Sequence, residues 1–222
     1  MKKLLTTILI LSITLTLSGC SKPEDEELPR YDIPRESSII LNELPYSAYL
    51  STSNPVITIE VEDMGEMKLQ LFPDVAPNTV NSIIEYIQNG DYEDNEFHRV
   101  INDFMIQGGQ LASPSCTIVG EMNNNPDYEG TNDLKHDRGV ISMARIGGMY
   151  NSQTSQFFIV HQDAYFLDNE YVTFGGLISG FNILDFIGPM GDNSNSVPAE
   201  RVTITNISVE LNGYAPESPI CQ

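Results

Sequence analysis

The stretch from Phe97 to Gln110, FHRVINDFMIQGGQ, constrains the fold of this chain more than any other segment. Its apolar residues fit two short, half-buried strands, and Asn102-Asp103 between them supplies the side chains of a tight turn. Arg99 and Gln107 conflict with that pattern. A guanidinium never loses its charge, so among aromatic and sulfur side chains it needs a dedicated partner unless it extends to solvent. The conflict marks this hairpin as a candidate functional site.

The same stretch satisfies every fixed position of F-H-R-x-I-x-x-F-M-x-Q-G-G, the signature of the cyclophilins, and therefore resembles these peptidyl-prolyl cis/trans isomerases. Residues 151–159 match the second pattern of that family, N-x-x-x-S-Q-F-F-I, and residues 136–145 closely resemble its bacterial members. A third block, residues 166–175, is similar as well. The resemblance implies an enzyme that accelerates rotation about Xaa-Pro bonds.

Hydrophobic periodicity predicts a mostly β chain with two helices. Residues 56–62 and 67–71 alternate apolar and polar side chains, as two antiparallel strands joined by a turn at Met64-Gly65 would. Apolar residues at helical spacing over 80–87 predict an amphipathic helix, residues 180–187 a shorter one, and residues 202–209 a closing strand. The resemblance implies a more specific architecture, a closed antiparallel β-barrel of about eight strands capped by two α-helices.

The resemblance also implies which side chains form the active site. Arg99 would be the catalytic donor, and Gln107 would orient it while contacting the substrate backbone. The positions implied to bind substrate are Phe104, Met105, Ala144, Arg145, Gln156, Phe158, Phe166, Leu167 and Tyr171. The apolar members would form a slot for the proline ring.

Two departures from the family pattern affect ligand preference. Phe166 stands where many eukaryotic cyclophilins carry Trp, and Tyr171 stands where they carry His. The missing indole donor implies weak binding of cyclosporin-type ligands. The loop from Arg145 to Tyr150 also differs from the common Asn-containing version, so the preferred substrate stays open. His98 is interpreted as structural.

The implied reaction sets modest chemical demands. Rotation about an Xaa-Pro bond must overcome a barrier of roughly 18–20 kcal/mol, but no bond is made or broken. We therefore expect no metal and no cofactor. A metal hydrolase is disfavoured because His98, His136 and His161 lack paired ligand spacing, and a cysteine protease because Cys116 lacks a surrounding signature. The open alternative is a lipid-tethered binding module or holdase that grips proline-containing segments without turnover.

The first 19 residues predict an export signal, because Met1-Lys2-Lys3 precedes a short apolar run. The run ends in Leu17-Ser18-Gly19-Cys20, which resembles the lipobox of bacterial lipoproteins and implies a lipid on Cys20. The alternatives are a transmembrane anchor, for which the run is short, or a simple cleaved signal. We expect an exported chain anchored to the outer face of the cell membrane, or to the outer membrane of a Gram-negative cell.

Removal of residues 1–19 leaves nine basic against 31 acidic residues, a formal charge of −22. Such a chain is repelled by nucleic acid, so we expect no nucleic-acid partner and membrane contact only through the lipid. Residues 20–54 are predicted to form an acidic tether containing proline, residues 55–212 one isomerase domain, and residues 213–222 a C-terminal tail. We expect a monomer whose clients are proline-containing polypeptides.

Two cysteines remain once Cys20 carries lipid. An even pair in an oxidising compartment favours a disulfide between Cys116 and Cys221. Against it, Cys221 lies in a proline-rich tail, and Cα atoms more than about 7 Å apart cannot be bridged without backbone movement. On balance the sequence slightly favours free thiols.

Overall fold

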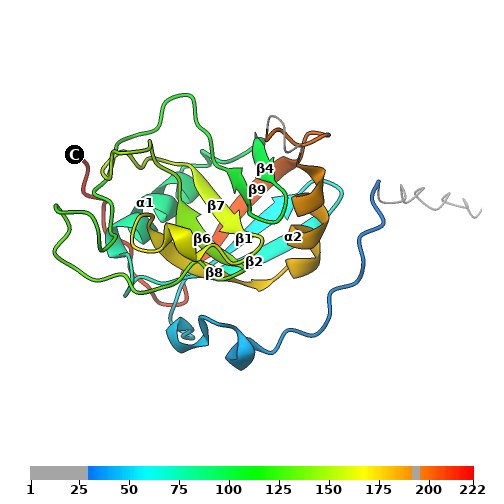
Figure 1. Ribbon diagram of the computed structural model, residues 1–222, viewed down its shortest axis with the longest axis horizontal. Coiled ribbons are helices and arrows are strands. Elements are labelled where there is room, and N and C mark those ends of the chain that lie inside the picture. The colour runs from blue at the N-terminus through cyan, green and yellow to red at the C-terminus, as the bar shows by residue number, and fades with distance from the viewer. Residues whose placement is uncertain (1–29, 192–195) are drawn as a thin grey trace, which may run out of the picture.

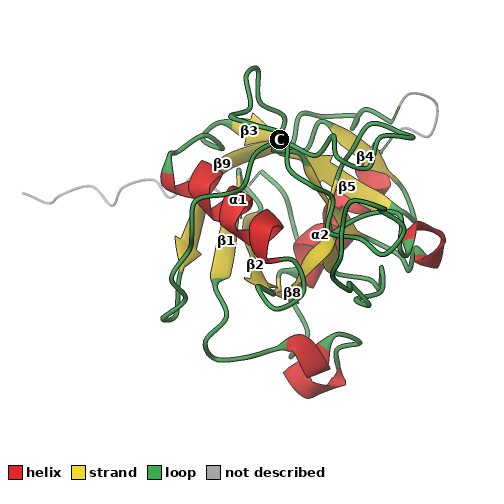
Figure 2. Cartoon of the chain, turned by 90° about the vertical axis from the view of Figure 1, so that its left-hand side faces the viewer, coloured by secondary structure: helices red, strands yellow, loops and turns green. Residues whose placement is uncertain are grey.

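The chain forms one curled antiparallel sheet with helices on two sides of it (Figure 2). The computed structural model describes residues 30–191 and 196–222. The strand order is β3-β9-β1-β2-β8-β6-β7-β5-β4. The strands are β1 (Val56–Val61), β2 (Gly65–Leu71), β3 (Asn95–Glu96), β4 (Arg99–Ile101), β5 (Met105–Gly108), β6 (Val140–Met143), β7 (Phe157–Val160), β8 (Thr173–Ser179) and β9 (Thr203–Glu210).

Two α-helices pack against this sheet, α1 (Pro77–Gln88) and α2 (Phe181–Ile187), and they lie at opposite sides of it (Figure 1). The prediction of a mostly β chain with two helices is thus confirmed. The sheet has nine strands, not about eight. In the described ranges no ladder joins the end strands β3 and β4, so the pairings show a curled half-barrel, and the predicted closed barrel is not shown.

The first hairpin forms as its alternating pattern predicts. In β1 every second side chain is buried, and β2 follows the same rule after its first residue. The turn covers Glu62–Met64 and not Met64-Gly65, because Asp63 takes the left-handed conformation with φ 59° and the Met64 N–H donates to the Val61 carbonyl. Aspartate tolerates this conformation better than most residues.

Both helices are capped by carboxylates from distant parts of the chain. Neither N-terminus has a capping side chain of its own. The Glu121 carboxylate accepts the Thr79 N–H at 2.8 Å and the Thr79 hydroxyl at 2.7 Å at the start of α1. At the start of α2, Glu36 Oε1 accepts the N–H groups of Gly180 and Phe181 at 2.7 and 2.6 Å. Each carboxylate satisfies amides that the helix leaves without partners.

Residues 30–54 lie along the domain, and we call them the strap (Figure 1). The part of the predicted tether that the structure describes packs against the domain, while residues 20–29 lie outside the described residues. Tyr46 is fully buried and its hydroxyl donates to the Leu177 carbonyl at 2.6 Å. Its ring covers Gly176 so closely that a Cβ there would clash with it. The strap is therefore part of the folded unit.

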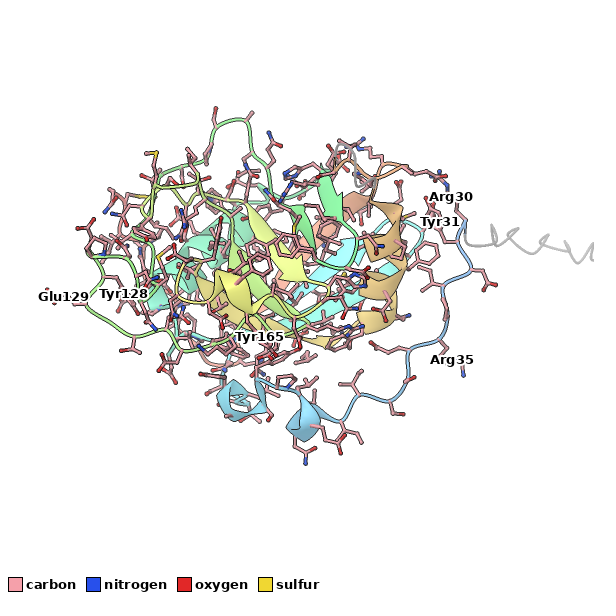
Figure 3. The ribbon with its side chains drawn as sticks, viewed as in Figure 1. Arg30, Tyr31, Arg35, Tyr128, Glu129 and Tyr165 are labelled. Carbon is pink, nitrogen blue, oxygen red and sulfur yellow. A yellow bond between two sulfur atoms is a disulfide. The ribbon has the colours of Figure 1, made fainter. Side chains whose placement is uncertain are left out.

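Removing the Tyr46 hydroxyl should destabilise the domain measurably. The Tyr46→Phe variant keeps the ring but loses the buried hydrogen bond to Leu177, and we expect the free energy of unfolding to fall by about 1–2 kcal/mol. Urea unfolding measures the change. Tyr128→Phe, which removes a hydroxyl from a partly exposed ring, is the control (Figure 3). Equal effects of the two variants would show that the strap contact is not stabilising.

The C-terminal tail is also fixed to the domain. Cys116 and Cys221 form a disulfide with Cα atoms 5.5 Å apart, so the prediction of free thiols is wrong. The tail reaches Cys116 because it is held on the way: the Tyr214 hydroxyl donates to Asn81 Oδ1 at 2.8 Å, and the Ile220 N–H donates to Asn78 Oδ1 at 2.7 Å. Both asparagines belong to α1. The tail is thus bound to the domain despite its prolines.

Buried apolar residues form two clusters. The larger cluster joins the sheet to both helices. The smaller one contains Tyr46 of the strap together with Phe72, Met105, Phe158 and Leu167. Across the described ranges no helix is both long and apolar enough to span a bilayer.

Candidate active site

A cavity of about 290 Å³ lies toward the β4 end of the sheet. We call it the main cavity because it contains most of the predicted site residues. Its lining consists of Arg99, Phe104, Met105, Gln107, Ala144, Arg145, Phe158, Phe166, Leu167 and Tyr171. All ten were predicted from the sequence. The remaining predicted residue, Gln156, lines an adjoining side cavity of about 410 Å³, which Gln107, Ala144 and Arg145 also border.

Three polar side chains form a row across neighbouring strands. Arg99 on β4 is the cross-strand partner of Gln107 on β5, so their side chains share one face. The Arg99 Nη1 donates to Gln107 Oε1 at 3.0 Å, and Gln107 Nε2 donates to Gln156 Oε1 at 2.9 Å. Gln107 thus fixes the guanidinium and is itself fixed by Gln156.

Among the described residues, the guanidinium of Arg99 has no acidic partner. Within the part of the chain that the structure describes, no carboxylate oxygen lies within 4 Å of it. Its other contact is Met105 Sδ, 3.8 Å from Nη1. The side chain is half-buried. Arg99 therefore presents a fixed positive charge whose remaining donors are free for a bound molecule.

Apolar side chains form the rest of the main cavity. Met105, Phe158 and Leu167 are buried with 1%, 4% and 8% exposure, so they are rigid parts of the smaller apolar cluster. Phe104 packs on Phe166 with ring centroids 5.3 Å apart. Phe166 itself is 72% exposed at the rim. The cavity offers an apolar slot beside the Arg99 guanidinium, which suits an uncharged ring next to a polar amide.

The profile of the family described as cyclophilin type peptidyl-prolyl cis-trans isomerase/CLD matches residues 56–209, which include every residue lining the main cavity. The chain belongs to this family. Its cyclophilin domain therefore extends at least from β1 into β9, and the strap precedes the matched region.

Curated relatives agree with this assignment. A peptidyl-prolyl cis-trans isomerase of Arabidopsis thaliana is 32% identical over 72% of the chain, which spans only about a quarter (25%) of that relative's length. A relative from Staphylococcus epidermidis, named for the same activity, is also 32% identical and is covered over 99% of its length. A cyclophilin from Cryptosporidium parvum, crystallised in the presence of the dipeptide Ala-Pro, is 27% identical with a TM-score of 0.62. That likeness covers 70% of this chain and 98% of the neighbour.

A buried histidine beneath the cavity of this cyclophilin was missed by the sequence reasoning. The His136 ring is fully buried and stacks on Phe158 with centroids 6.0 Å apart. Its Nδ1 lies 3.0 Å from Asp168 Oδ1 and its Nε2 lies 3.0 Å from Ser142 Oγ. Burial lowers the pKa of His136, against the opposing effect of Asp168. The His136 ring therefore supports the cavity wall at Phe158. In the sequence, the only indication of this role was the polar stretch before β6.

The sequence also singled out His98 and Arg145, and both side chains are at least partly buried. His98, interpreted as structural, is half-buried, and burial lowers its pKa; its Nδ1 has no hydrogen-bond partner in the described part of the chain. Arg145 lies at the main cavity as predicted, but its side chain is only 6% exposed and is bonded to its own chain. Its guanidinium is therefore less available to a substrate than that of Arg99.

Proposed function

We propose that this cyclophilin accelerates cis/trans isomerisation of Xaa-Pro bonds in polypeptide clients. The observation that carries the proposal is the Arg99 guanidinium, which has no ion pair among the described residues and is held by Gln107 at the edge of an apolar cavity. The names of the relatives, and the Ala-Pro dipeptide present with the Cryptosporidium neighbour, support the same chemistry.

The reaction requires a pocket that binds the twisted amide better than the planar one. Resonance makes uncatalysed exchange slow, on the order of tens to hundreds of seconds. As the amide twists, the prolyl nitrogen becomes pyramidal and gains lone-pair character. A fixed donor near that nitrogen stabilises the twisted state selectively and lowers the barrier. Arg99 is that donor, and Gln107 keeps its planar fork from rotating away.

The apolar wall makes that donor more effective. The proline ring would lie against Met105, Phe158 and Leu167, which are buried and fixed. A pocket of this kind excludes water from the twisting bond, and a charge-assisted hydrogen bond is stronger where the local dielectric is low. No nucleophile takes part, because no covalent bond changes.

A binding module without turnover is the second candidate. The open rim with exposed Phe166 is compatible with it, since a holdase also needs an apolar surface. A module that only binds, however, does not need a guanidinium that no described carboxylate neutralises. We therefore favour the enzyme.

Turnover decides between the two. Exchange between the cis and trans forms of an Ala-Pro tetrapeptide, followed by NMR with catalytic amounts of the folded chain, should be faster than in buffer. The heat-unfolded chain at the same concentration is the control. Equal exchange rates in the two samples, despite measurable peptide binding by the folded chain, would favour the binding module.

We further propose that the chain acts outside the cytoplasm, anchored by a lipid on Cys20, and assists the folding of exported proteins there. The signal-like residues 1–19 and Cys20 lie outside the described residues, so the support comes from their sequence. The Cys116–Cys221 disulfide gives independent support, because such bonds persist in oxidising compartments.

Replacing the proposed lipid attachment site should release the protein. In cells that express Cys20→Ala, we expect the chain to move from the membrane fraction to the soluble fraction, since no thiol remains to carry the lipid. Fractionation and immunoblotting measure the shift. Cys116→Ala, which leaves Cys20 in place, is the matched control. Retention of Cys20→Ala in the membrane would show that another segment provides the anchor.

A further inference from the structure

The Arg145 side chain is held by its own chain at each of its three nitrogens. Its Nε donates to the Glu170 carbonyl at 2.8 Å, and its Nη2 donates to the Glu170 carboxylate at 3.2 Å. Its Nη1 donates to the Ile146 carbonyl at 3.2 Å. The guanidinium carbon lies 4.9 Å from the centroid of the Tyr150 ring and 4.5 Å from that of Tyr171. With 6% of the side chain exposed, little of it remains for a client.

These contacts join two segments that border the main cavity. Ala144 and Arg145 belong to the first segment, residues 144–150, and Tyr171 belongs to the second, residues 169–171. The Tyr171 ring meets the Phe158 ring edge-on, with centroids 6.0 Å apart. Whatever holds Tyr171 therefore also fixes one wall of the cavity.

The middle of the first segment, from Ile146 to Met149, makes few side-chain packing contacts. It contains Gly147 and Gly148, and a Cβ added at either would meet nothing within 4 Å. Its apolar residues Ile146 and Met149 are 61% and 56% exposed. Bonds to a nearby residue also hold it: the Ile146 N–H donates to Ser152 Oγ at 2.9 Å, and the Ser152 hydroxyl donates to the Met149 carbonyl at 2.7 Å. The bonds of Arg145 differ from these because they cross to the second segment.

Glu170 extends the connection to a third loop. Its second carboxylate oxygen accepts Asn124 Nδ2 at 2.6 Å, and the Asn124 N–H donates to the Asn169 carbonyl at 3.1 Å. Glu170 is thus shared between Arg145 and the loop around Asn124. Three loops that are far apart in the sequence meet at this carboxylate.

We propose that Arg145, with Glu170 and Tyr150, forms a clamp that positions the Tyr171–Phe158 wall of the main cavity. This inference rests on the proposed isomerase function, and it assigns Arg145 the part of a positioning residue and not of a substrate-contacting one. Client preference at this wall then comes from the backbone of residues 144–145 and from the Tyr171 and Phe158 rings. The charge of Arg145 is paired with that of Glu170. The planar fork of arginine is what allows one side chain to bind both a carbonyl and a carboxylate.

Substitutions within the clamp test this arrangement. We expect Arg145→Met to lower kcat/KM about tenfold, mainly through a higher KM, because a displaced wall weakens binding of the planar and the twisted amide alike. Arg145→Lys keeps the charge but not the fork, and should lose about threefold. Glu170→Gln should lose about threefold as well. The double variant Arg145→Met/Glu170→Gln should lose no more than Arg145→Met alone, because both act through one contact.

Matched controls come from exposed residues elsewhere on the surface. Arg35→Met and Glu129→Gln make the same chemical changes away from the cavity (Figure 3), and they should leave kcat/KM unchanged. Amide hydrogen exchange supplies a readout independent of turnover. In Arg145→Met, residues 144–150 and 169–171 should exchange at least tenfold faster, while β1 and β2 keep their protection.

Peptide series separate the clamp from direct contact with the client. A positioning residue predicts the same loss for Ala-Pro and Glu-Pro peptides. A tenfold larger loss for the Glu-Pro peptide would show that the guanidinium binds the client and would overturn the proposal, as would an Arg145→Met enzyme with unchanged kinetics and exchange. Faster exchange throughout β1 and β2 would also contradict it, because the residue would then stabilise the whole fold. If the wild type shows no turnover, the isomerase assignment fails. Amide hydrogen exchange and peptide affinity would still test the clamp in that case.

Discussion

Replacing Arg99 by alanine is expected to lower kcat/KM by roughly 30- to 1,000-fold. The figure follows from a charge-assisted hydrogen bond made only in the twisted state, worth about 2–4 kcal/mol in a site shielded from water. Peptide affinity and the unfolding free energy should change little, because Arg99 has no ion pair among the described residues and its partners there, Gln107 and Met105, are neutral. Exchange NMR gives the rate, and calorimetry gives the peptide affinity.

Arg99→Lys separates charge from geometry. Lysine keeps the positive charge but lacks the planar fork that Gln107 holds, so we expect only part of the loss to be recovered. Arg35→Ala, at an exposed position, serves as the control. If a folded Arg99→Ala protein turns over at the wild-type rate, Arg99 has no part in the mechanism. If it loses peptide affinity and the wild type has negligible turnover, the site is a binding module.

Loss of the Cys116–Cys221 disulfide is expected to lower the free energy of unfolding by about 4–5 kcal/mol in the chain-entropy account. The two cysteines are 105 residues apart, so the bond restricts a large part of the unfolded chain. For a domain of this size the loss corresponds to a fall in Tm of roughly 8–20 °C. Urea unfolding of the Cys116→Ser/Cys221→Ser double variant measures it.

The wild type with and without reductant controls for the effect of the serines themselves. Reduction should produce the same loss as the double variant. Thiol titration of the unfolded, unreduced protein should find neither Cys116 nor Cys221 reactive. Two reactive thiols would contradict the bond seen in the structure, and a loss below about 1 kcal/mol would show that the tail is held by its contacts to α1 alone.

The residues of the site were easier to predict from the sequence than the contacts that hold the surrounding fold together. The residues of the main cavity lie in short motifs, and the pairing of β4 with β5 follows from a local hairpin pattern, whereas the pairing of β5 with β7 joins strands that are distant in the sequence. Once the strands pair, Arg99 and Gln107 must share a face. Their roles, in contrast, came from the resemblance and await the measurements proposed above.

The frame depends on contacts that local patterns do not encode. Tyr46 follows an acidic, proline-containing stretch and gives no sign of its slot above Gly176, which is created by a strand some 130 residues later. Glu121 and Glu36 cap helices to which they are not adjacent in sequence, and single acidic residues in a chain with 31 of them carry no signal. His136 was missed for the same reason, since its partners Asp168 and Ser142 come together only in the fold.

The position of the strap at the start of the domain has a consequence for how the chain is made. Its partners Leu177, Gly180 and Phe181 lie 131, 144 and 145 residues further along. At synthesis rates of about 5–20 residues per second, Tyr46 waits roughly 7–30 s before Leu177 exists. Throughout that interval the strap has none of these partners, and α2 has not yet been made. Docking of the strap therefore belongs to the final stage of folding, after translation of β8 and α2.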